Sequence, residues 1–376
     1  MINIIEKGNC CGCSACETIC PNQSITMNAD EEGFFYPKVN HQSCVNCNLC
    51  NQVCPLENKG AKNTIIKTYA AKHRDVDVLK QSTSGGIFTA LSDNVLSVGG
   101  CVYGASFDDS MVVKHQRAIN AEERDTMRGS KYVQSDTRSV FSMVKKDLEE
   151  GKFVLFTGTP CQIDGLNHYL KGKTEGLLCC DLICHGVSSP LILKEHFKFI
   201  SGRNRKKLTN YFFRPKRWGW HVHREIALFE GGKEYHSCAY SDLWRSIYYG
   251  RLATRPSCHS CQYSNLLRPG DITIGDCRGI DKLAPEFGSY DGVSLVLVNT
   301  QKGKEAFDDI RKQLIVREIN IDDVMQPPLQ EPSEPSGNRE LFWNTYLEKG
   351  YKKAIDACFG HSYRLKYQVK KLLHKD

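Results

Sequence analysis

The sequence predicts an α/β protein that begins with a small α+β unit and ends in a short helical tail. Two observations indicate this fold class. Cysteines are concentrated in residues 1–57, and from Ile65 onward strand-like segments alternate with helix-like segments. The chain of 376 residues, 25% charged and 40% hydrophobic, is long enough for a buried core and for more than one folding unit.

The N-terminal unit, residues 1–57, carries two copies of one cysteine motif, C-x2-C-x2-C-x3-C-P. Three thiolates at this spacing bind one 4Fe-4S cluster, and the fourth, which precedes the proline, binds the neighbouring cluster. Crossed ligation is therefore expected. The predicted ligands are Cys10, Cys13, Cys16 and Cys54 for the first cluster, and Cys44, Cys47, Cys50 and Cys20 for the second.

This unit resembles the bacterial-type two-cluster ferredoxin. A pair of zinc sites is the alternative, but such sites usually need only four ligands in two CxxC pairs. Cys11 is an additional cysteine with no ligand role in the pattern. Clusters of this kind transfer single electrons and select no substrate, so we expect the substrate chemistry to lie further along the chain.

A polar linker at 56–64 leads into the larger domain, whose first part spans residues 65–148. Its predicted strands are 66–73, 101–107 and 111–118, and its predicted helices are 84–97 and 137–150. The second part, residues 149–325, continues the alternation. Its predicted strands are 152–158, 177–184, 271–276 and 292–299, and its predicted helices are 161–172, 188–202 and 302–314. A Pro-rich segment, 325–338, ends this domain, and residues 338–376 are expected to form a helical, basic tail.

No secretory signal is expected from the sequence. Its first residues lack the layout of a secretory signal, and no apolar run approaches the roughly 20 residues needed to span a bilayer. We therefore expect a cytoplasmic protein with no membrane span. In that compartment the nineteen cysteines indicate metal or redox chemistry rather than disulfides.

A second set of cysteines lies in the larger domain. Cys161 and Cys184 each follow an apolar strand, and Cys258 and Cys261 form a CxxC pair. Strand ends of α/β proteins gather at one edge of the sheet, so these four thiols could close one site. A zinc site that uses His185 or His259 is a rival interpretation, and unliganded core cysteines are another.

Several motifs in the larger domain resemble one known family. These motifs are TSGGIFTAL, SKYVQSD, FTGTPCQ, CHGVSSP, and CxxCxY followed by RPGDITIGD. Together they resemble the family of coenzyme F-420 hydrogenase/dehydrogenase beta subunits, over about residues 65–320. The resemblance implies an iron-sulfur flavoprotein that passes electrons between clusters, FAD and a final partner. It also implies a third 4Fe-4S cluster on Cys161, Cys184, Cys258 and Cys261.

The flavin site follows mainly from this resemblance. Residues 82–86 precede a helix, where free backbone N–H groups suit a pyrophosphate, although an ordinary helix N-cap has the same composition. The resemblance places FAD contacts at Ser84, Gly85, Gly86, Lys131, Tyr132, Gly275 and Asp276. Lys131 near the flavin could stabilise negative charge on the reduced ring; a solvated loop lysine is the alternative.

One segment departs from the family pattern. Many relatives carry aromatic residues directly after the GD of GDITIGD, whereas this chain has Cys277 and Arg278. This difference predicts a more polar acceptor pocket and leaves the identity of the acceptor open. The remaining cysteines, Cys11, Cys101, Cys179, Cys180, Cys238, Cys277 and Cys358, are interpreted mainly as small buried hydrophobic residues.

The formal charge of +7 is unevenly distributed. Eight basic residues and no acidic residue lie between Arg203 and Arg224, and the tail is a second basic segment. A solvated edge is one interpretation of the first segment. The other interpretation is a binding site for an anionic partner. That partner could be an anionic cofactor, a small anionic acceptor such as coenzyme F-420, a nucleotide-linked sugar or an acidic ferredoxin. His221 and His223 of this segment are a weak candidate for a substrate site.

The function predicted from these features is an FAD- and iron-sulfur-dependent oxidoreductase with an organic acceptor. A relay subunit of a larger complex without its own substrate is an alternative, and a reductase of surface-polysaccharide synthesis is another. Nucleic-acid binding is the least favoured interpretation of the basic segment. The acceptor, the direction of electron flow, the oligomeric state and any catalytic acid or base stay open.

Overall fold

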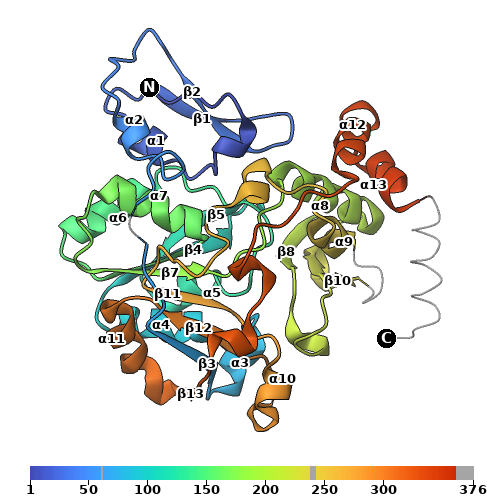
Figure 1. Ribbon diagram of the computed structural model, residues 1–376. Coiled ribbons are helices and arrows are strands. Elements are labelled where there is room, and N and C mark those ends of the chain that lie inside the picture. The colour runs from blue at the N-terminus through green and yellow to red at the C-terminus, as the bar shows by residue number, and fades with distance from the viewer. Residues whose placement is uncertain (61, 238–242, 289, 361–376) are drawn as a thin grey trace.

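The computed structural model describes residues 1–60, 62–237, 243–288 and 290–360 (Figure 1). Its centre is a mixed eight-stranded sheet. In sheet order the strands are β13 (Leu314–Glu318), β3 (Lys67–His73), β12 (Ser294–Val298), β11 (Ile272–Asp276), β7 (Leu177–Leu182), β6 (Val154–Gly158), β4 (Cys101–Phe107) and β5 (Val113–Ala118). The strands β11, β7, β6 and β4 are parallel, and the outer strands pair antiparallel. The predicted α/β fold class is confirmed.

Helices cover both faces of this sheet, because alternate residues of the buried strands point to opposite sides. Leu155 and Leu178 belong to one apolar cluster, and their neighbours Phe156 and Cys179 belong to another. The helices α4 (Ile87–Ser97) and α11 (Gln301–Ile310) pack in the first cluster, and α6 (Val140–Glu149) and α7 (Pro160–Leu170) in the second. The shorter helices of the domain are α3 (Val76–Gln81), α5 (Ala121–Asp125) and α10 (Ile280–Leu283).

The N-terminal unit forms a small layer of its own above α6 and α7 (Figure 1). It consists of α1 (Ala15–Ile19), β1 (Ile25–Ala29), β2 (Phe35–Val39) and α2 (Leu49–Gln52), with the two strands antiparallel. Cys13, Ala15 and Val53 are buried in the same apolar cluster as Phe141 and Ile163 of the larger domain. The unit is therefore docked on the domain by shared core packing.

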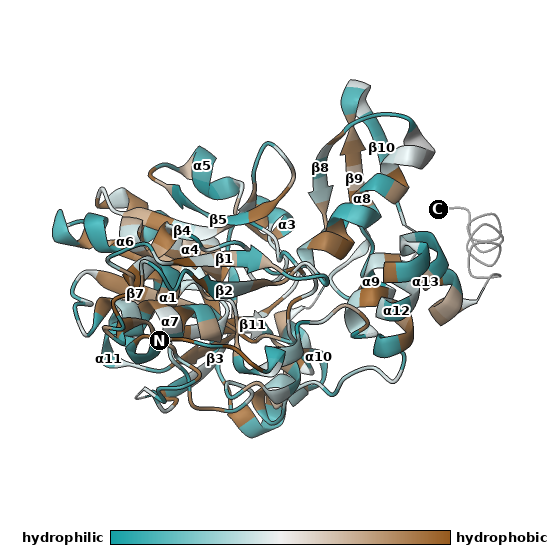
Figure 2. Ribbon diagram, turned by 90° about the horizontal axis from the view of Figure 1, so that it is seen from above, coloured by the Kyte–Doolittle hydropathy of each residue, from teal (hydrophilic) through white to brown (hydrophobic). Residues whose placement is uncertain are grey.

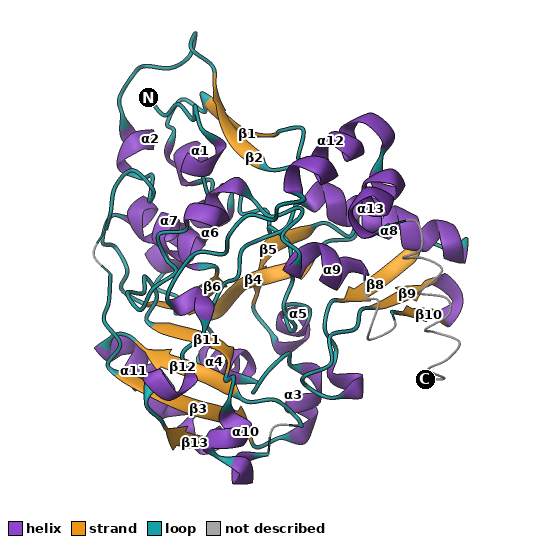
Figure 3. Ribbon diagram, turned by 45° about the vertical axis from the view of Figure 1, so that its right-hand side comes forward, coloured by secondary structure: helices purple, strands orange, loops and turns teal. Residues whose placement is uncertain are grey.

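A second lobe stands beside the large sheet (Figures 1 and 3). Its elements are α8 (Pro190–Asn204), β8 (Leu208–Phe212), β9 (Ile226–Phe229), β10 (Lys233–His236), α9 (Leu243–Tyr249), α12 (Arg339–Lys349) and α13 (Tyr351–Phe359). Its three strands form a separate antiparallel sheet with β9 in the middle, and Figure 2 shows β9 coloured as hydrophobic. One apolar cluster joins these segments, with Ile192, Phe229, Trp244 and Phe342 at its centre.

Several helices and strands of the structure differ from the prediction. The helix expected over 302–314 ends at Ile310, and residues 314–318 form the edge strand β13, which was not predicted. The three strands of the second lobe were not predicted either. Within the predicted tail, α12 and α13 cover 339–359, and residues 361–376 lie outside the described part of the chain. No helix in the described ranges is both long and apolar enough to cross a membrane.

Candidate metal centres and cofactor cavity

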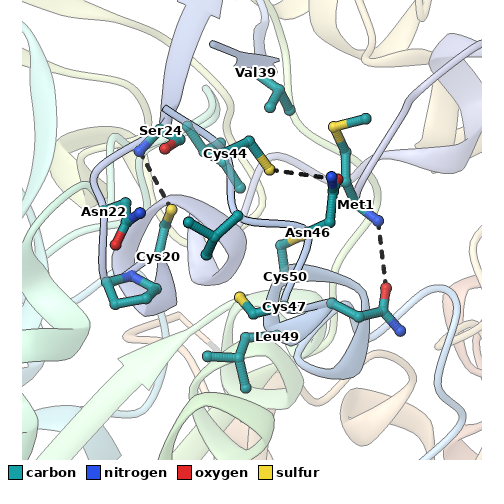
Figure 4. Close-up of a pocket in the computed structure, with 14 residues that line it drawn as sticks. Met1, Cys20, Asn22, Ser24, Val39, Cys44, Asn46, Cys47, Leu49 and Cys50 are labelled. Atoms are coloured by element: carbon teal, nitrogen blue, oxygen red, sulfur yellow. Dashed lines mark hydrogen bonds between the residues drawn. The ribbon is translucent and has the colours of Figure 1, made fainter. Parts of the chain in front are cut away.

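Four cysteines of the N-terminal unit surround one small pocket. Cys20, Cys44, Cys47 and Cys50 all line it, and Figure 4 shows their side chains around the same space. Backbone N–H groups donate to two of the sulfur atoms, from Ile2 to Cys50 Sγ at 3.2 Å and from Ser24 to Cys20 Sγ at 3.3 Å. Such donors stabilise negative charge on sulfur. The pocket therefore has the donor set of the predicted second cluster.

The other four cysteines of this unit lie together in its interior. Cys10, Cys13, Cys16 and Cys54 are each at most 9% exposed. Burial raises the pKa of the Cys16 thiol, and the nearby Cys10 and Cys54 raise it further. Burial first, and then the charges of Glu57 and Cys10, also raise the pKa of the Cys54 thiol. Cys54 therefore lies near Cys10 and Cys16, and Cys20 lies in the pocket of the second set, while the crossed ligation itself stays a prediction.

These thiol groups suit a bound iron-sulfur cluster better than an empty interior. Buried thiolates that lie beside one another repel, and a metal centre supplies the positive charge that offsets this repulsion. In the part of the chain that the structure describes, no three His, Cys, Asp or Glu side chains gather around a site for a single metal ion. Soft thiolate donors of this kind favour iron-sulfur clusters over hard cations.

The larger domain brings its own four cysteines together. Cys161 lies at the start of α7 after β6, and Cys184 follows the neighbouring parallel strand β7. Burial is the first cause that raises the pKa of the Cys184 thiol, and Cys258 and Cys161 follow as causes. Burial raises the pKa of Cys258 to about 12, with contributions from Cys261 and Cys161. All four thiols predicted for the third cluster are therefore neighbours.

The two histidines of the rival zinc interpretation, His185 and His259, are sequence neighbours of Cys184 and Cys258. The His259 ring bonds through Nδ1 to the Ser333 carbonyl oxygen at 2.8 Å. His185 lines a cavity, where burial first, and then the charge of Arg278, lowers its pKa to about 4. Neither histidine is drawn toward the four thiols by a contact in the described residues.

Cys11 occupies a position that the cysteine spacing did not reveal. The neighbouring Cys13 thiol is the first cause that raises the pKa of Cys11, and the Cys161 thiol also interacts with it. Gly165 of α7 lies so close to the first set that a Cβ there would be 2.8 Å from Cys13 Sγ. Cys11 thus lies between the first and third groups of thiols. Of the other additional cysteines, Cys101, Cys179, Cys180 and Cys277 are buried, Cys358 is half-buried, and Cys238 lies outside the described residues.

A cavity of about 260 Å³ lies at the carboxyl ends of the parallel strands. Six of the seven residues predicted to contact FAD line it: Ser84, Gly86, Lys131, Tyr132, Gly275 and Asp276. Cys184 of the third group lines the same cavity. The predicted flavin loops and one thiol of the third group therefore share one space, at the edge of the sheet where α/β proteins bind ligands.

Gly85, the seventh predicted residue, packs under the cavity instead of lining it. Its N–H donates to Ser294 Oγ at 2.9 Å, and the His73 N–H donates to its carbonyl oxygen at 2.7 Å. A Cβ at this position would lie 2.2 Å from the Ala71 carbonyl oxygen. Gly85 therefore fixes the loop against β3 and β12.

Replacing Gly85 with alanine is expected to destabilise the protein by about 1–3 kcal/mol, because the loop must move away from two strands. The matched control is Gly202→Ala in α8, where a Cβ meets no atom within 4 Å. That control is expected to stabilise the protein by about 0.5–1 kcal/mol, the usual gain for Gly to Ala inside a helix. Thermal unfolding of the two variants measures both effects, and equal midpoints would contradict the assigned role of Gly85.

The basic segment 203–224 contributes one cation to the wall of the cavity, Arg214, and a second, Lys216, that bonds to the backbone of a lining residue. Arg214 is 7% exposed and pairs with Asp276 at 2.6 Å. Lys216 Nζ donates to the Ser84 carbonyl oxygen at 2.9 Å, and burial lowers its pKa to about 8. Arg217, by contrast, is exposed and pairs with Glu234. The segment is therefore a solvated edge only in part. The side chain of Arg203 is outside the described residues.

Two aromatic residues that line the same cavity were not predicted from the sequence, and one of them contacts His223, a predicted weak candidate for a substrate site. Tyr248 and Tyr249 of α9 line it, and Tyr132 packs against Tyr248 with ring centroids 4.8 Å apart. His223 receives a bond from the Tyr249 hydroxyl at 3.2 Å, and burial lowers its pKa to about 3. No local pattern marks α9 as part of a site, because it reaches the cavity from the second lobe.

Comparisons with known proteins bear on both parts of the chain. Residues 9–58 match the family model of the 4Fe-4S dicluster domain. Residues 151–324 match the family model for the C terminus of the coenzyme F420 hydrogenase/dehydrogenase beta subunit. The chain joins a dicluster domain to this beta-subunit domain. The chain is thus similar to an iron-sulfur domain over residues 9–58 and to a subunit domain of an oxidoreductase over residues 151–324.

Two relatives share most of their length with the chain. The F subunit of the F(420)H(2) dehydrogenase of Methanosarcina mazei is 23% identical over 333 residues, which cover 84% of this chain and 86% of the relative. A chain in the structure of the F420-reducing [NiFe] hydrogenase complex from Methanosarcina barkeri is similar at 18% identity and a TM-score of 0.48, over 84% of this chain and 95% of that one. The beta-subunit domain contains Cys161, Cys184, Cys258 and Cys261, and the dicluster domain contains the two earlier sets.

Proposed function

We propose that the chain is an iron-sulfur flavoprotein oxidoreductase that moves electrons between its dicluster domain and an organic acceptor at the cavity. The cavity itself carries the proposal. Its wall contains Cys184 of the third thiol group together with the loops expected to hold FAD. The third thiol group in turn lies beside the first through Cys11. One continuous series of redox sites is thus available.

Each proposed group supplies a chemistry that the side chains lack: clusters carry single electrons, and FAD collects two for an organic acceptor. The chain's own residues hold and tune these groups. The proposed ligands of the third cluster are Cys161, Cys184, Cys258 and Cys261. The proposed FAD contacts are Ser84, Gly86, Lys131, Tyr132, Gly275 and Asp276. Gly85 positions the loop that contains Ser84 and Gly86.

The proposed acceptor is anionic and small. Arg278 lines the cavity, and the charges of Arg278 and Arg214 contribute to lowering the pKa of both His185 and His223. Coenzyme F420 belongs to this class of acceptor and is named in the relatives that the chain resembles. Since those relatives are named as a subunit and as part of a complex, a relay subunit is the second candidate function. An acidic ferredoxin-like protein is the proposed partner at the dicluster domain, and an oligomer is compatible with either function.

The deciding experiment is anaerobic purification followed by quantification of iron, sulfide and flavin. The proposal expects about 12 iron atoms and one FAD per chain. About eight iron atoms would leave only the dicluster domain loaded, and absent flavin would overturn the flavoprotein proposal. The dithionite-reduced protein is then mixed with coenzyme F420 or another two-electron acceptor. Reoxidation supports an enzyme, whereas reoxidation by a partner protein alone supports the relay subunit.

The affinity of the cavity for FAD is expected to depend on pH near neutrality because of Lys131. Its ammonium nitrogen donates to the carbonyl oxygens of Thr126 at 3.1 Å and Arg128 at 2.8 Å, and burial lowers its pKa to about 7. The side chain is therefore charged at pH 6 and mostly neutral at pH 8. Because a positive charge favours an anionic ligand, FAD is expected to bind several-fold more tightly at pH 6.

Equilibrium binding of FAD at the two pH values measures this effect in the wild type and in Lys131→Met, which should lose it. Lys216→Met is the control. Lys216 titrates near pH 8, so its removal should leave the step near pH 7 in place. A pH dependence that survives in Lys131→Met would assign the effect to another group.

A further inference from the structure

Arg255 is buried at the junction between the dicluster domain and the beta-subunit domain. It is 1% exposed and lies three residues before Cys258. Its Nε donates to the Cys10 carbonyl oxygen at 2.8 Å, Nη1 to Gln134 Oε1 at 2.9 Å and Nη2 to the Phe35 carbonyl oxygen at 3.0 Å. One guanidinium thus binds the first cysteine loop and the strand β2 from the opposite domain.

The partners of this guanidinium are all neutral. Besides the three oxygens, it stacks on the rings of Tyr36 at 4.4 Å and Phe34 at 5.4 Å. In the described parts of the chain no carboxylate lies within ion-pair distance of Arg255. The nearby loop 30–32 holds three acidic residues that are already paired, Asp30 and Glu31 with Lys7 and Glu32 with Arg339.

A buried charge without a counter-ion destabilises the folded protein, because the charge loses its hydration and gains no opposite charge in return. The missing negative charge lies in the thiol groups around Arg255. A Cβ on Gly12, between Cys11 and Cys13, would lie 2.9 Å from Arg255 Nη1, and the Cys258 N–H donates to the Arg255 carbonyl oxygen at 3.0 Å. Cys10 belongs to the first set and Cys258 to the third, so the positive charge is placed between two redox groups.

We propose that Arg255 is the resident counter-charge of the first and third clusters and raises the reduction potential of both. Reduction of a 4Fe-4S cluster adds one electron and one negative charge, without a proton. A fixed positive charge nearby stabilises that reduced form, and surrounding hydrogen bonds and charges are known means of setting cluster potentials. For the third cluster the inference rests on the proposed function. For the first cluster it rests on the dicluster domain alone.

The test is an anaerobic redox titration followed by electron paramagnetic resonance. In Arg255→Met the equilibrium constants for reduction of the first and third clusters are expected to fall about tenfold, equal to about 59 mV for a one-electron couple. The second cluster, bound by Cys20, Cys44, Cys47 and Cys50, should keep its potential. Arg255→Lys retains the charge and should stay close to the wild type, which a merely structural role would not predict.

A second variant keeps the arginine and neutralises its charge. Gln134→Glu places a carboxylate against Nη1, so the first and third potentials should fall in the same direction as in Arg255→Met. This variant decides the question even if Arg255→Met loses iron. Arg138→Met is the matched control, because Arg138 stacks on Phe35 at 4.6 Å but pairs with Asp136, and no potential should change.

Unchanged potentials in both Arg255→Met and Gln134→Glu would overturn the inference, as would equal shifts in Arg255→Lys and Arg255→Met. Failure of the proposed function is a separate result. If the wild type shows about eight iron atoms and no third signal, the third cluster is removed from the proposal. The potential of the first cluster then still tests Arg255.

Discussion

Replacing Cys258 with serine is expected to remove about four of the 12 iron atoms and to stop electron transfer between the dicluster domain and the cavity. Cys258 lies among Cys161, Cys184 and Cys261, and a hydroxyl is a poor substitute for a soft thiolate. Both clusters of the dicluster domain should persist, because their ligands lie in residues 10–54. Iron analysis, electron paramagnetic resonance and acceptor reoxidation together measure these effects.

The control for this variant is Cys358→Ser in α13, which lies in the second lobe and is half-buried. It should retain the full iron content and wild-type turnover. If Cys258→Ser also kept about 12 iron atoms, the third cluster would not depend on Cys258, and the ligand assignment would be wrong.

Replacing Arg268 with methionine is expected to cost about 3–5 kcal/mol of stability, because the substitution leaves a buried carboxylate without its partner. Arg268 is 1% exposed and Asp181 is fully buried, and their side chains meet at 2.6 Å. Arg268 also donates to the carbonyl oxygens of Tyr263 and Leu182 at 2.9 and 3.0 Å. The pair fastens the segment that follows Cys261 to strand β7.

Thermal unfolding and soluble yield measure this loss. The double variant Arg268→Met with Asp181→Asn removes both charges and should recover part of it. Arg317→Met is the control, since the exposed pair of Arg317 with Glu286 is worth at most about 1 kcal/mol. A loss in Arg268→Met no larger than in this control would show that the buried pair contributes little.

The cysteine groups could be predicted from the sequence because their geometry is largely local. Cys10, Cys13 and Cys16 are held by a short loop and one helical turn, and only Cys54 must come from the second motif. The third group needs one tertiary fact, that β6 and β7 are adjacent and parallel. Alternation of strands and helices predicts this arrangement, so the strand-end argument brought Cys161 and Cys184 together.

The second lobe and the junction residues could not be predicted in the same way. α8 and α12 lie in one apolar cluster although more than a hundred residues separate them in the sequence. No periodicity specifies such a pairing. Arg255 and Arg214 look like ordinary surface cations in the sequence, and only tertiary packing reveals that both are buried. The helix expected to continue to 314 ends early because Leu314–Glu318 pair with β3 as an edge strand.

The position of β3 has a consequence for synthesis of the chain. β3 is the first strand after the dicluster domain, yet both of its neighbours, β12 and β13, come from the last part of the sheet. A nascent chain therefore holds β3 without β12 until about residue 298 has left the ribosome, and without β13 until about residue 318. Sheets whose strands pair over such long sequence separations fold slowly, and their folding intermediates expose apolar surface and unpaired strand edges that promote aggregation. The dicluster domain, whose strands pair within residues 25–39, can reach its final form long before the rest.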